Sequence, residues 1–523
     1  MAETSWWQKG IIYHIYPRSF ADSNGDGIGD LNGLIQRLDY LAELGIDAIW
    51  LSPIYPSPDK DFGYDVADYT DIDPRYGSLA DFDRLLQEAH ARGIRVILDL
   101  VLNHTSDQHP WFQESRSSRT NPKADWYIWQ DRIPNNWQAT FGGKAWSYDP
   151  KRRQYYLHLF LPEQPDVNWR NPQVRQAMLD VVRFWLERGV DGFRLDVFNA
   201  YFKDAQLRSN PFTPFGRRPF EWQKHIYDVD QPEMFPLLNE LRRILDSHPE
   251  RYAVGETFLS TAERAARYCG PDLLHAAFNF EFTNTRYDPR AFLRAVQKWE
   301  AALGGRAWPN YVLSNHDLPR SATRYGQGED DSRPRLVLAM LLTLRGTPFL
   351  YYGEEIGMRD VALHRSEILD PLGRHYWPFH KGRDGARTPM QWSDAPYAGF
   401  STVRPWLRVH ENYRRRNVEA MLQDENSLLN FVRRLIRLRR ATPALHSGDF
   451  QPLAATDRLL AYLRRWEEQE VLVALNFSSR STSFDLPPGR WEPLFAFPQW
   501  PASSLTSPLL LPSHQVLLAR RAA

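Results

Sequence analysis

The chain has 523 residues, too many for one small core, so its length favours one large domain with appendages or several domains. Its 64 Lys and Arg residues balance 64 Asp and Glu residues, which argues against nucleic acid or a membrane surface as a partner. A single cysteine, Cys269, excludes an intrachain disulfide framework. Residues 1–10 resemble no secretory signal and no run of about 18 apolar residues occurs, so we expect a cytoplasmic protein.

Eight short apolar runs alternate with helical patterns along most of the chain. The expected strands are residues 11–20, 46–54, 94–101, 190–197, 252–257, 276–280, 311–317 and 347–356. These runs are apolar almost throughout, which is typical of parallel strands that are buried on both faces. Apolar residues recur at helical spacing in the segments 31–45, 79–93, 173–188, 233–246 and 334–345. Strands and helices in this alternation predict an α/β fold, a (β/α)8 TIM barrel.

Two long interruptions and one change of pattern divide the chain. Residues 102–171 are too long for a connecting loop and are rich in Trp, Asn and Pro, so we expect a small inserted domain after the third strand. Residues 357–420 form a second irregular excursion, which we expect to lie over the barrel mouth. Short alternating runs in residues 449–523 predict a C-terminal β-sandwich, and the barrel then comprises residues 1–101 and 172–448.

Ionisable side chains stand where the expected strands end, and in a TIM barrel the site is built from the C-terminal strand ends. They are Arg194 and Asp196, Glu256, Asp317, and the histidines His104 and His316. Arg194 and Asp196 are two residues apart and share a strand face, so the guanidinium can keep the carboxylate ionised. Paired carboxylates, one ionised and one protonated, are what cleavage of a glycosidic bond needs. Buried ion pairs that merely stabilise strand ends are the alternative, which accounts poorly for six such groups at one mouth.

Four segments carry a family resemblance, "DLVLNH" (99–104), "GFRLDV" (192–197), "GET" (255–257) and "SNHD" (314–317). In order and spacing they resemble the signature regions of the α-amylase superfamily of retaining glycoside hydrolases, glycoside hydrolase family 13. The resemblance covers nearly the whole chain and includes "GYDVADY" (63–69), "QPDVNW" (164–169) and "GRDGARTPMQW" (382–392). The last two segments are similar to the α-glucosidase and oligo-1,6-glucosidase branch.

The resemblance implies a role for each matching residue. Asp196 would be the nucleophile that forms a covalent glucosyl intermediate, and Glu256 would protonate the leaving oxygen and then act as base for water. Asp317 would hold the 2- and 3-hydroxyls of the bound glucose. His104 and His316 would donate hydrogen bonds to hydroxyls of the same sugar.

The remaining implied roles concern the walls of the pocket. Arg194 would orient Asp196, and Tyr64 would stack on the glucose. Asp65 and Arg387 would close the bottom of the pocket as an ion pair that grips the non-reducing end, with a structural salt bridge as the alternative. A pocket closed in this way admits only a chain end, so cleavage would be exo-acting.

The segment "DSNGDGIGD" (22–30) is spaced like the start of a calcium-binding loop. Its candidate ligands are Asp22, Asn24, Asp26, the carbonyl of Ile28, and Asp30. The twelfth position holds Gly33 where an EF-hand has Glu. The resemblance implies a structural Ca²⁺ or Mg²⁺ ion here and no organic cofactor, and a metal-free loop of Asx turns is the alternative.

Linkage preference rests on the residue after the expected nucleophile. Val197 resembles the branch members that cleave α-1,6 links, whereas Thr there resembles those that prefer α-1,4 links. The exchange of one methyl for a hydroxyl discriminates by only about 1 kcal/mol, and "FNAYFKD" (198–204) departs from the "IN" of the oligo-1,6 group. We therefore expect an exo-acting retaining α-glucosidase of short maltose- and isomaltose-type substrates, with some glucosyl transfer.

Two alternatives stay open at this point. The first is a dedicated oligo-1,6-glucosidase; a sucrose-acting transferase or isomerase is less favoured and has no clear motif in its support. The second is a non-catalytic interaction module like the ectodomains of transporter heavy chains, which use the same fold. The intact set of three carboxylates disfavours the second. The sequence indicates no oligomeric state.

Overall fold

The computed structural model describes residues 4–259, 261–500 and 505–522. Its main sheet has eight parallel strands in the order β10-β11-β1-β2-β3-β7-β8-β9. Their bounds are β1 Ile12–Ile15, β2 Ala48–Leu51, β3 Arg95–Leu100, β7 Gly192–Leu195, β8 Tyr252–Gly255, β9 Ala276–Ala277, β10 Asn310–Val312 and β11 Thr347–Tyr351. Each lies within or overlaps a predicted strand, so the TIM-barrel prediction is confirmed. The outermost ends of the predicted domains, residues 1–3 and 523, lie outside the described residues.

The helices between the strands begin and end close to where their apolar periodicity does. They are α2 Leu31–Gln36, α3 Leu38–Leu44, α4 Leu79–Ala91, α6 Pro172–Glu187, α7 Met234–Asp246, α10 Pro289–Leu303 and α12 Ser332–Thr343. Helix α4 has a capping box in which Ser78 and Asp81 bond each other's backbone N–H. The single helix predicted over 31–45 is two helices, because the backbone leaves helical geometry at Arg37.

Apolar side chains fill the interior of the barrel below the strand ends. They come from several of the strands and include Trp50, Ile97, Val254, Phe278 and Phe349. The ring of His14 stacks on Trp50 with 3.6 Å between the ring centroids. Because this layer excludes water beneath them, the charged groups at the upper ends of the strands stand on an apolar floor.

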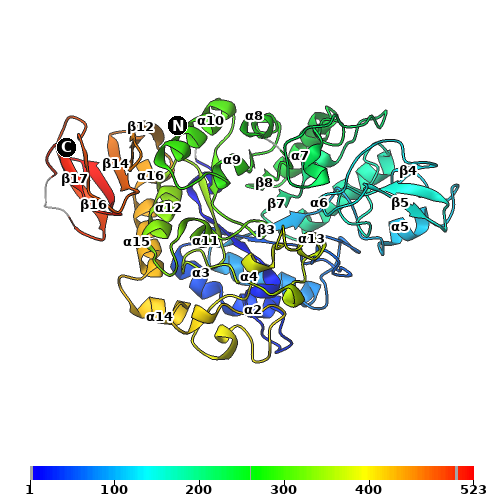
Figure 1. Cartoon of the computed structure of the whole chain (residues 1–523), viewed down its shortest axis with the longest axis horizontal. Coiled ribbons are helices and arrows are strands. Elements are labelled where there is room, and N and C mark those ends of the chain that lie inside the picture. The colour runs from blue at the N-terminus through cyan, green and yellow to red at the C-terminus, as the bar shows by residue number, and fades with distance from the viewer. Residues whose placement is uncertain (1–3, 260, 501–504, 523) are drawn as a thin grey trace.

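Residues 102–171 leave the barrel between β3 and α6 and fold beside it (Figure 1). They contain helix α5 Pro110–Ser115 and an antiparallel sheet of β4 Trp129–Gln130, β6 Gln154–Leu157 and β5 Trp146–Asp149, in that order. Trp137, Trp146 and Leu159 of this segment pack with Ala200 and Val229, which follow β7. This shared core fixes the inserted segment against the loop after the fourth barrel strand.

The C-terminal part is built from two antiparallel sheets. The larger contains β12 Asp449–Ala455, β13 Leu459–Trp466, β14 Gln469–Asn476, β18 Val516–Arg521 and β16 Trp491–Phe497, and the smaller pairs β15 Thr482–Phe484 with β17 Leu509–Leu511. Leu459 and Leu517 of one sheet pack with Leu511 of the other, as the predicted sandwich requires.

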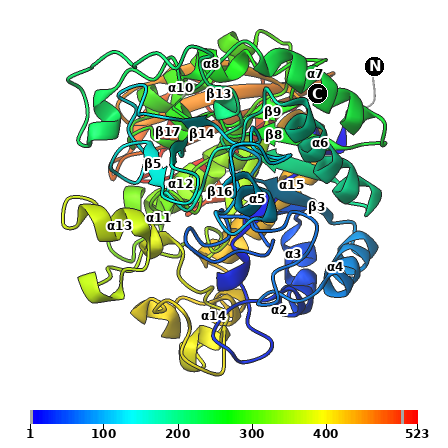
Figure 2. The same ribbon diagram turned by 90° about the vertical axis from the view of Figure 1, so that its right-hand side faces the viewer.

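The shorter helices complete the fold and connect its parts. They are α1 Trp6–Lys9, α8 Ala262–Ala266, α9 Phe280–Thr283, α11 Ser321–Tyr325, α13 Pro371–Tyr376, α14 Val418–Gln423, α15 Leu428–Ala441 and α16 Pro443–His446. Helices α13 and α14 both follow β11 in the chain, and Figure 2 shows them toward the left and the bottom of the view. Phe431 of α15 contacts the rings of Phe495 and Phe497, which joins the barrel to the C-terminal sheet. In the described part of the chain no helix combines the length and apolarity needed to cross a membrane.

Candidate active site

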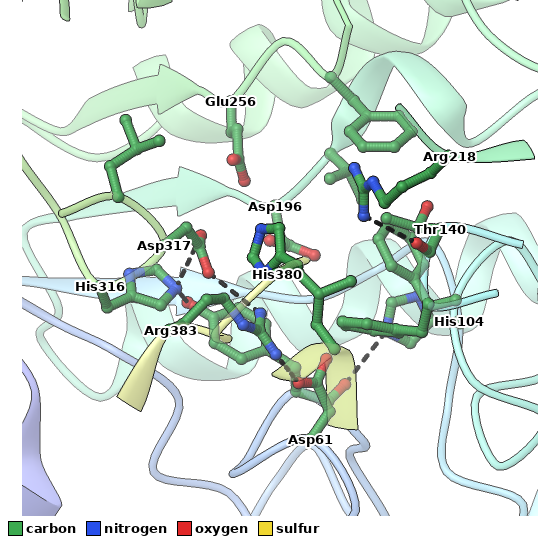
Figure 3. A pocket seen from close by; sticks show the side chains of 17 residues that line it. Asp61, His104, Thr140, Asp196, Arg218, Glu256, His316, Asp317, His380 and Arg383 are labelled. Carbon is green, nitrogen blue, oxygen red and sulfur yellow. Dashed lines mark hydrogen bonds and ion pairs between the residues drawn. The ribbon is translucent and has the colours of Figure 1, made fainter. Parts of the chain in front are cut away.

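A cavity of about 310 Å³ opens at the carboxyl ends of the barrel strands (Figure 3). Most of the predicted catalytic and substrate-binding residues line it, namely Tyr64, His104, Asp196, Glu256, His316 and Asp317. Asp196 directly follows β7, Glu256 directly follows β8, and Asp317 lies in the loop after β10. The strand ends therefore bring together residues that are far apart in the sequence.

Arg194 lies under the cavity and joins three carboxylates. Its Nη1 is 2.7 Å from Asp99 Oδ1 and 2.6 Å from Asp196 Oδ1, and its Nη2 contacts Glu256 Oε2. The Arg194 side chain is 1% exposed, so these interactions act in a medium of low effective dielectric constant. The prediction that Arg194 and Asp196 point to one mouth agrees with this geometry, and Asp99 is an additional partner that sequence reasoning did not assign.

Burial sets the protonation of this group. Burial raises the pKa of Asp196 well above its usual range and also raises that of Glu256, while Arg194 opposes the rise in both. Burial likewise raises the pKa of Asp99 to about 6, again against Arg194. Because three carboxylates share one guanidinium, Asp196 and Glu256 titrate together, and the pair keeps one proton to a higher pH than free carboxyl groups do. An ionised and a protonated carboxyl group can thus coexist in the cavity.

Asp317 is held ionised by the groups around it. Its Oδ1 lies 3.1 Å from Arg383 Nη1 and 3.1 Å from Arg387 Nη2, and its Oδ2 lies 3.1 Å from His316 Nε2. Burial opposes ionisation, but His316, Arg383 and Arg387 lower the pKa of Asp317 well below its ordinary value. The side chain keeps 30% of its surface exposed, so its oxygens remain open to the hydroxyls of a sugar.

Tyr64 and the two histidines form one wall. The Tyr64 hydroxyl is 2.8 Å from His316 Nε2 and 3.0 Å from Asp99 Oδ2, and its ring stacks on the His316 ring at 5.3 Å between centroids. Burial lowers the pKa of His316 well below 6.5 and that of His104 to about 4, so both rings are neutral near pH 7. A neutral imidazole carries one proton, so each can donate one hydrogen bond and accept another.

The predicted ion pair between Asp65 and Arg387 is wrong. Asp65 is fully buried outside the cavity lining, where its carboxylate accepts from Ser57 Oγ at 2.9 Å, Lys60 N at 2.9 Å and Asp61 N at 3.0 Å. Arg387 instead donates from Nε to the His316 carbonyl at 2.7 Å and pairs with Asp317. Asp65 thus shapes the loop, and Arg387 supports the residue that would hold the sugar.

The pair that closes the cavity is Asp61 with Arg383. Arg383 Nη2 is 2.7 Å from Asp61 Oδ1, and its Nη1 reaches Asp317 (Figure 3). The same Nη2 is 2.8 Å from Oδ1 of Asp370, which lies outside the cavity lining. Asp61 and Arg383 both line the cavity. Each lies four positions before the residue that was predicted, one just ahead of "GYDVADY" and the other inside "GRDGARTPMQW". The motifs pointed to the two segments, but one segment holds two acids, Asp61 and Asp65, and the other holds two arginines, Arg383 and Arg387.

The rim of the cavity comes from the two long interruptions of the barrel. Phe141 and Phe160 belong to the inserted segment, Leu372 and His380 belong to residues 357–420, and Phe258 follows β8. Part of residues 357–420 therefore lies at the barrel mouth, as predicted. A mostly apolar rim around polar groups at the base is typical of a small-molecule site.

Val197 has a strained backbone next to Asp196. Its φ is 34° and its ψ is 38°, a left-handed conformation that β-branched residues rarely adopt. Val197 is 4% exposed and lines the cavity. Strain of this kind costs about 1–3 kcal/mol and persists where the surroundings hold it, commonly at functional sites.

The carboxylates of loop 22–30 already accept hydrogen bonds from their own backbone. Asp22 Oδ1 accepts from Gly25 N at 2.7 Å, and Asp26 Oδ1 accepts from Ile28 N at 2.8 Å. Asp30 caps helix α2 through Gly33 N at 2.7 Å. Among residues 4–259, 261–500 and 505–522, no three His, Cys, Asp or Glu side chains are grouped as a metal centre. The spacing that predicted a metal therefore stays a prediction.

The cavity at the strand ends, with three carboxylates around an arginine, defines a glycoside hydrolase of the TIM-barrel kind. Residues 14–448 match the family model described as the α-amylase catalytic domain, and residues 450–516 match the maltogenic amylase C-terminal domain. The chain belongs to the α-amylase family of glycoside hydrolases and is an enzyme.

Similar proteins of known name share nearly the whole chain. A probable α-glucosidase of Rhizobium meliloti (strain 1021) is 45% identical, over 94% of this chain and 93% of its own length. An oligo-1,6-glucosidase of Parageobacillus thermoglucosidasius is 40% identical, over 93% of this chain and 92% of its own. The crystal structure of the α-glucosyl transfer enzyme XgtA superposes with a TM-score of 0.95 at 44% identity, covering 99% of this chain and 100% of that one.

Proposed function

We propose that this enzyme is an exo-acting, retaining α-glucosidase that releases glucose from the non-reducing ends of short α-glucosides. The observation that carries the proposal is the closed base of the cavity. Asp61, Arg383 and Asp317 form a charged cluster there, directly beside Asp196 and Glu256. A base of this kind holds the hydroxyls of one terminal sugar and leaves no passage for a chain, so cleavage takes place at the chain end.

The proposed reaction is a double displacement. Asp196 attacks the anomeric carbon while Glu256 gives its proton to the leaving oxygen, and the covalent glucosyl-enzyme is then hydrolysed by a water that Glu256 deprotonates. Contact of both carboxylates with one guanidinium supports retention, since it keeps them close. Inverting enzymes separate their carboxyl groups by about 6.5–9.5 Å to admit a water.

The ionised Asp317 completes the proposed mechanism. Two arginines and His316 keep its charge, so it can accept hydrogen bonds from two neighbouring sugar hydroxyls that strengthen as positive charge develops on the ring. When water does not reach the glucosyl-enzyme first, a sugar hydroxyl can take its place. The name of the α-glucosyl transfer enzyme among the similar structures supports transfer as a side activity.

The second candidate is a dedicated oligo-1,6-glucosidase. The names of several relatives support it, as does Val197 at the position where the resemblance distinguishes linkages. A similar structure is a trehalulose synthase at 34% identity, which keeps a sucrose-acting enzyme among the alternatives. Carboxylates at all three catalytic positions remove the support for a non-catalytic module.

Glucose release from maltose, isomaltose, sucrose and maltotriose, measured side by side, tests the proposal. The Asp196→Asn variant serves as the blank, since it loses the nucleophile and keeps the shape of the site. We expect maltose to be cleaved at least as fast as isomaltose. A strong preference for isomaltose would make the second candidate correct, and near-normal turnover by Asp196→Asn would contradict the assigned nucleophile.

Two further expectations belong to this proposal. The spacing of Asp22, Asn24, Asp26, Ile28 and Asp30 supports a structural Ca²⁺ or Mg²⁺ ion in loop 22–30, which elemental analysis of the purified protein would test. The ion would lie in a loop outside the cavity and take no part in the steps above. A cytoplasmic location is supported by the sequence alone, and cell fractionation would test it.

A further inference from the structure

Lys203 is a buried cation that the proposed mechanism does not use. It lies seven positions after Asp196, and its side chain is fully buried between the barrel and the inserted segment. Its ammonium group is 2.6 Å from Asp166 Oδ2, 2.8 Å from Asn103 Oδ1 and 2.5 Å from the Ala200 carbonyl. All three protons of the ammonium are thus directed to oxygen atoms.

This contact determines how the Asn103 amide is oriented. An ammonium group can only donate, so the oxygen of the amide must face Lys203 and the NH2 group must point the other way. On that side Asn103 Nδ2 is 3.2 Å from His104 Nδ1. Both residues are almost completely buried, at 0% and 1% exposure, so no bulk water can replace these partners. The amide therefore donates to Nδ1, which must carry a lone pair.

The other ring nitrogen of His104 has partners that favour opposite tautomers. Nε2 is 3.1 Å from the Tyr64 carbonyl, which needs a proton on the nitrogen. It is also 3.1 Å from Gln164 Nε2, which would donate to a lone pair. The Gln164 amide cannot turn to relieve this, since its NH2 group lies 3.2 Å from Asp61 Oδ2 and its oxygen accepts from Leu161 N at 3.1 Å. The hydrogen bond at Nδ1 must therefore determine which tautomer His104 adopts.

We propose that Lys203 is a positioning residue that acts through Asn103 to hold His104 in the tautomer with its proton on Nε2. The proton then lies on Nε2, which contacts the Tyr64 carbonyl in the free enzyme, and because His104 lines the cavity this proton can be shared with or passed to a hydroxyl of the bound sugar. The inference rests on the proposed function, because it assigns His104 a sugar hydroxyl as partner. Lys203 thereby links the inserted segment, through Asp166, to the donor that contacts the substrate.

The Asn103→Asp variant tests the inference most directly. The new carboxylate can still bind Lys203, but its second oxygen accepts where the amide donated, so His104 must move its proton to Nδ1. We expect kcat/KM for maltose to fall about tenfold or more, because a donor to the substrate becomes an acceptor. The thermal midpoint is measured as well, because the variant places a second carboxylate beside the Lys203–Asp166 pair and so adds a buried negative charge. Asn168→Asp, in the same inserted segment, is the matched control for an added charge.

Lys203→Met provides the complementary variant. It frees the Asn103 amide to turn, so both tautomers of His104 should be populated and kcat/KM should fall by less than in Asn103→Asp. It should also lower the thermal midpoint, because Asp166 is left buried without its cation. If Lys203 were only structural, Lys203→Met would destabilise the protein and Asn103→Asp would leave kcat/KM within about twofold of the wild type.

Histidine-selective ¹⁵N NMR reads the tautomer without using activity. The His104 ring signals are identified by their loss in His104→Gln, and two-bond ¹H–¹⁵N correlations show which nitrogen is protonated. We expect the Nε2–H pattern in the wild type and the Nδ1–H pattern in Asn103→Asp. The Nε2–H pattern in both proteins would overturn the inference. A wild type that shows the expected tautomer but releases no glucose from any substrate would instead contradict the proposed function.

Discussion

Replacing Arg383 by Met should lower the free energy of unfolding of the protein and weaken its binding of substrate. Arg383 is 11% exposed and contacts Asp61, Asp317 and Asp370, of which Asp370 is completely buried. Met fills a similar volume but leaves these carboxylates without their shared cation. Removing one partner of a buried ion pair costs about 3–5 kcal/mol, because the remaining charge stays buried and uncompensated.

The structure places the expected cost at the lower end of that range. Asp317 keeps Arg387, and Asp61 keeps Gln164 as a donor at 3.2 Å. Asp370 loses the most, since in the described part of the chain its remaining donors are the backbone N–H groups of Leu372 and Arg383. We therefore expect the free energy of unfolding to fall by about 3 kcal/mol, and KM for maltose to rise because the base of the cavity loses its order.

Chemical denaturation and steady-state kinetics measure these two effects, with Arg374→Met as the matched control. Arg374 lies on α13, is exposed, and donates from Nε to the Ile368 carbonyl, so its loss should change stability by less than about 0.5 kcal/mol. The double variant Arg383→Met/Asp61→Asn should recover part of the loss, because it removes one of the unpaired charges.

The pH dependence gives a second check with a defined sign. Burial raises the pKa of Asp370, but Arg383 and Arg387 lower it by more than burial raises it. The pKa in the folded protein therefore lies below the pKa in the unfolded chain. The wild type therefore gains stability from Asp370 above the unfolded pKa and loses it as pH falls through the folded pKa. Without Arg383 the folded pKa rises, so the stability difference between variant and wild type should shrink on acidification. Equal stability and equal KM at pH 7 would refute this account of the cluster.

Other variants separate the remaining roles. Glu256→Gln should slow natural disaccharides far more than substrates with a good leaving group, and equal losses on both would argue that Glu256 is not the acid. In the wild type, activity should fall as pH rises through the raised pKa of the Asp196–Glu256 unit, and Glu256→Gln should lack this alkaline limb of its pH profile. Asp61→Asn should raise KM for maltose, whereas Asp65→Asn should mainly reduce stability, and the reverse result would restore the pair predicted from the sequence. Chelation should lower the thermal midpoint more than the initial rate; an immediate loss of activity would contradict a purely structural ion.

The local sequence determined the barrel and the positions of its candidate catalytic carboxylates. The eight strands are apolar almost throughout, and this signal depends only on neighbouring residues, because a buried parallel strand has no solvent-facing side. Asp196 and Glu256 were predictable for the same reason, since each directly follows its strand and must therefore lie at the mouth. The division of helix 31–45 at Arg37 was not predictable, because the apolar spacing continues through it.

Only the tertiary structure decided which loop residues pair. Asp61 and Asp65 are two acids four positions apart, and Arg383 and Arg387 are two arginines at the same spacing. The two segments that hold them lie more than 300 residues apart in the chain. Spacing cannot choose between them, because the choice depends on how two irregular loops meet above the barrel. The same holds for Lys203, whose partners Asn103 and Asp166 come from other segments and become neighbours only when the inserted segment packs on the barrel. Strand identity is a local property of the sequence, whereas the partner of a buried charge is set by the packing of distant segments.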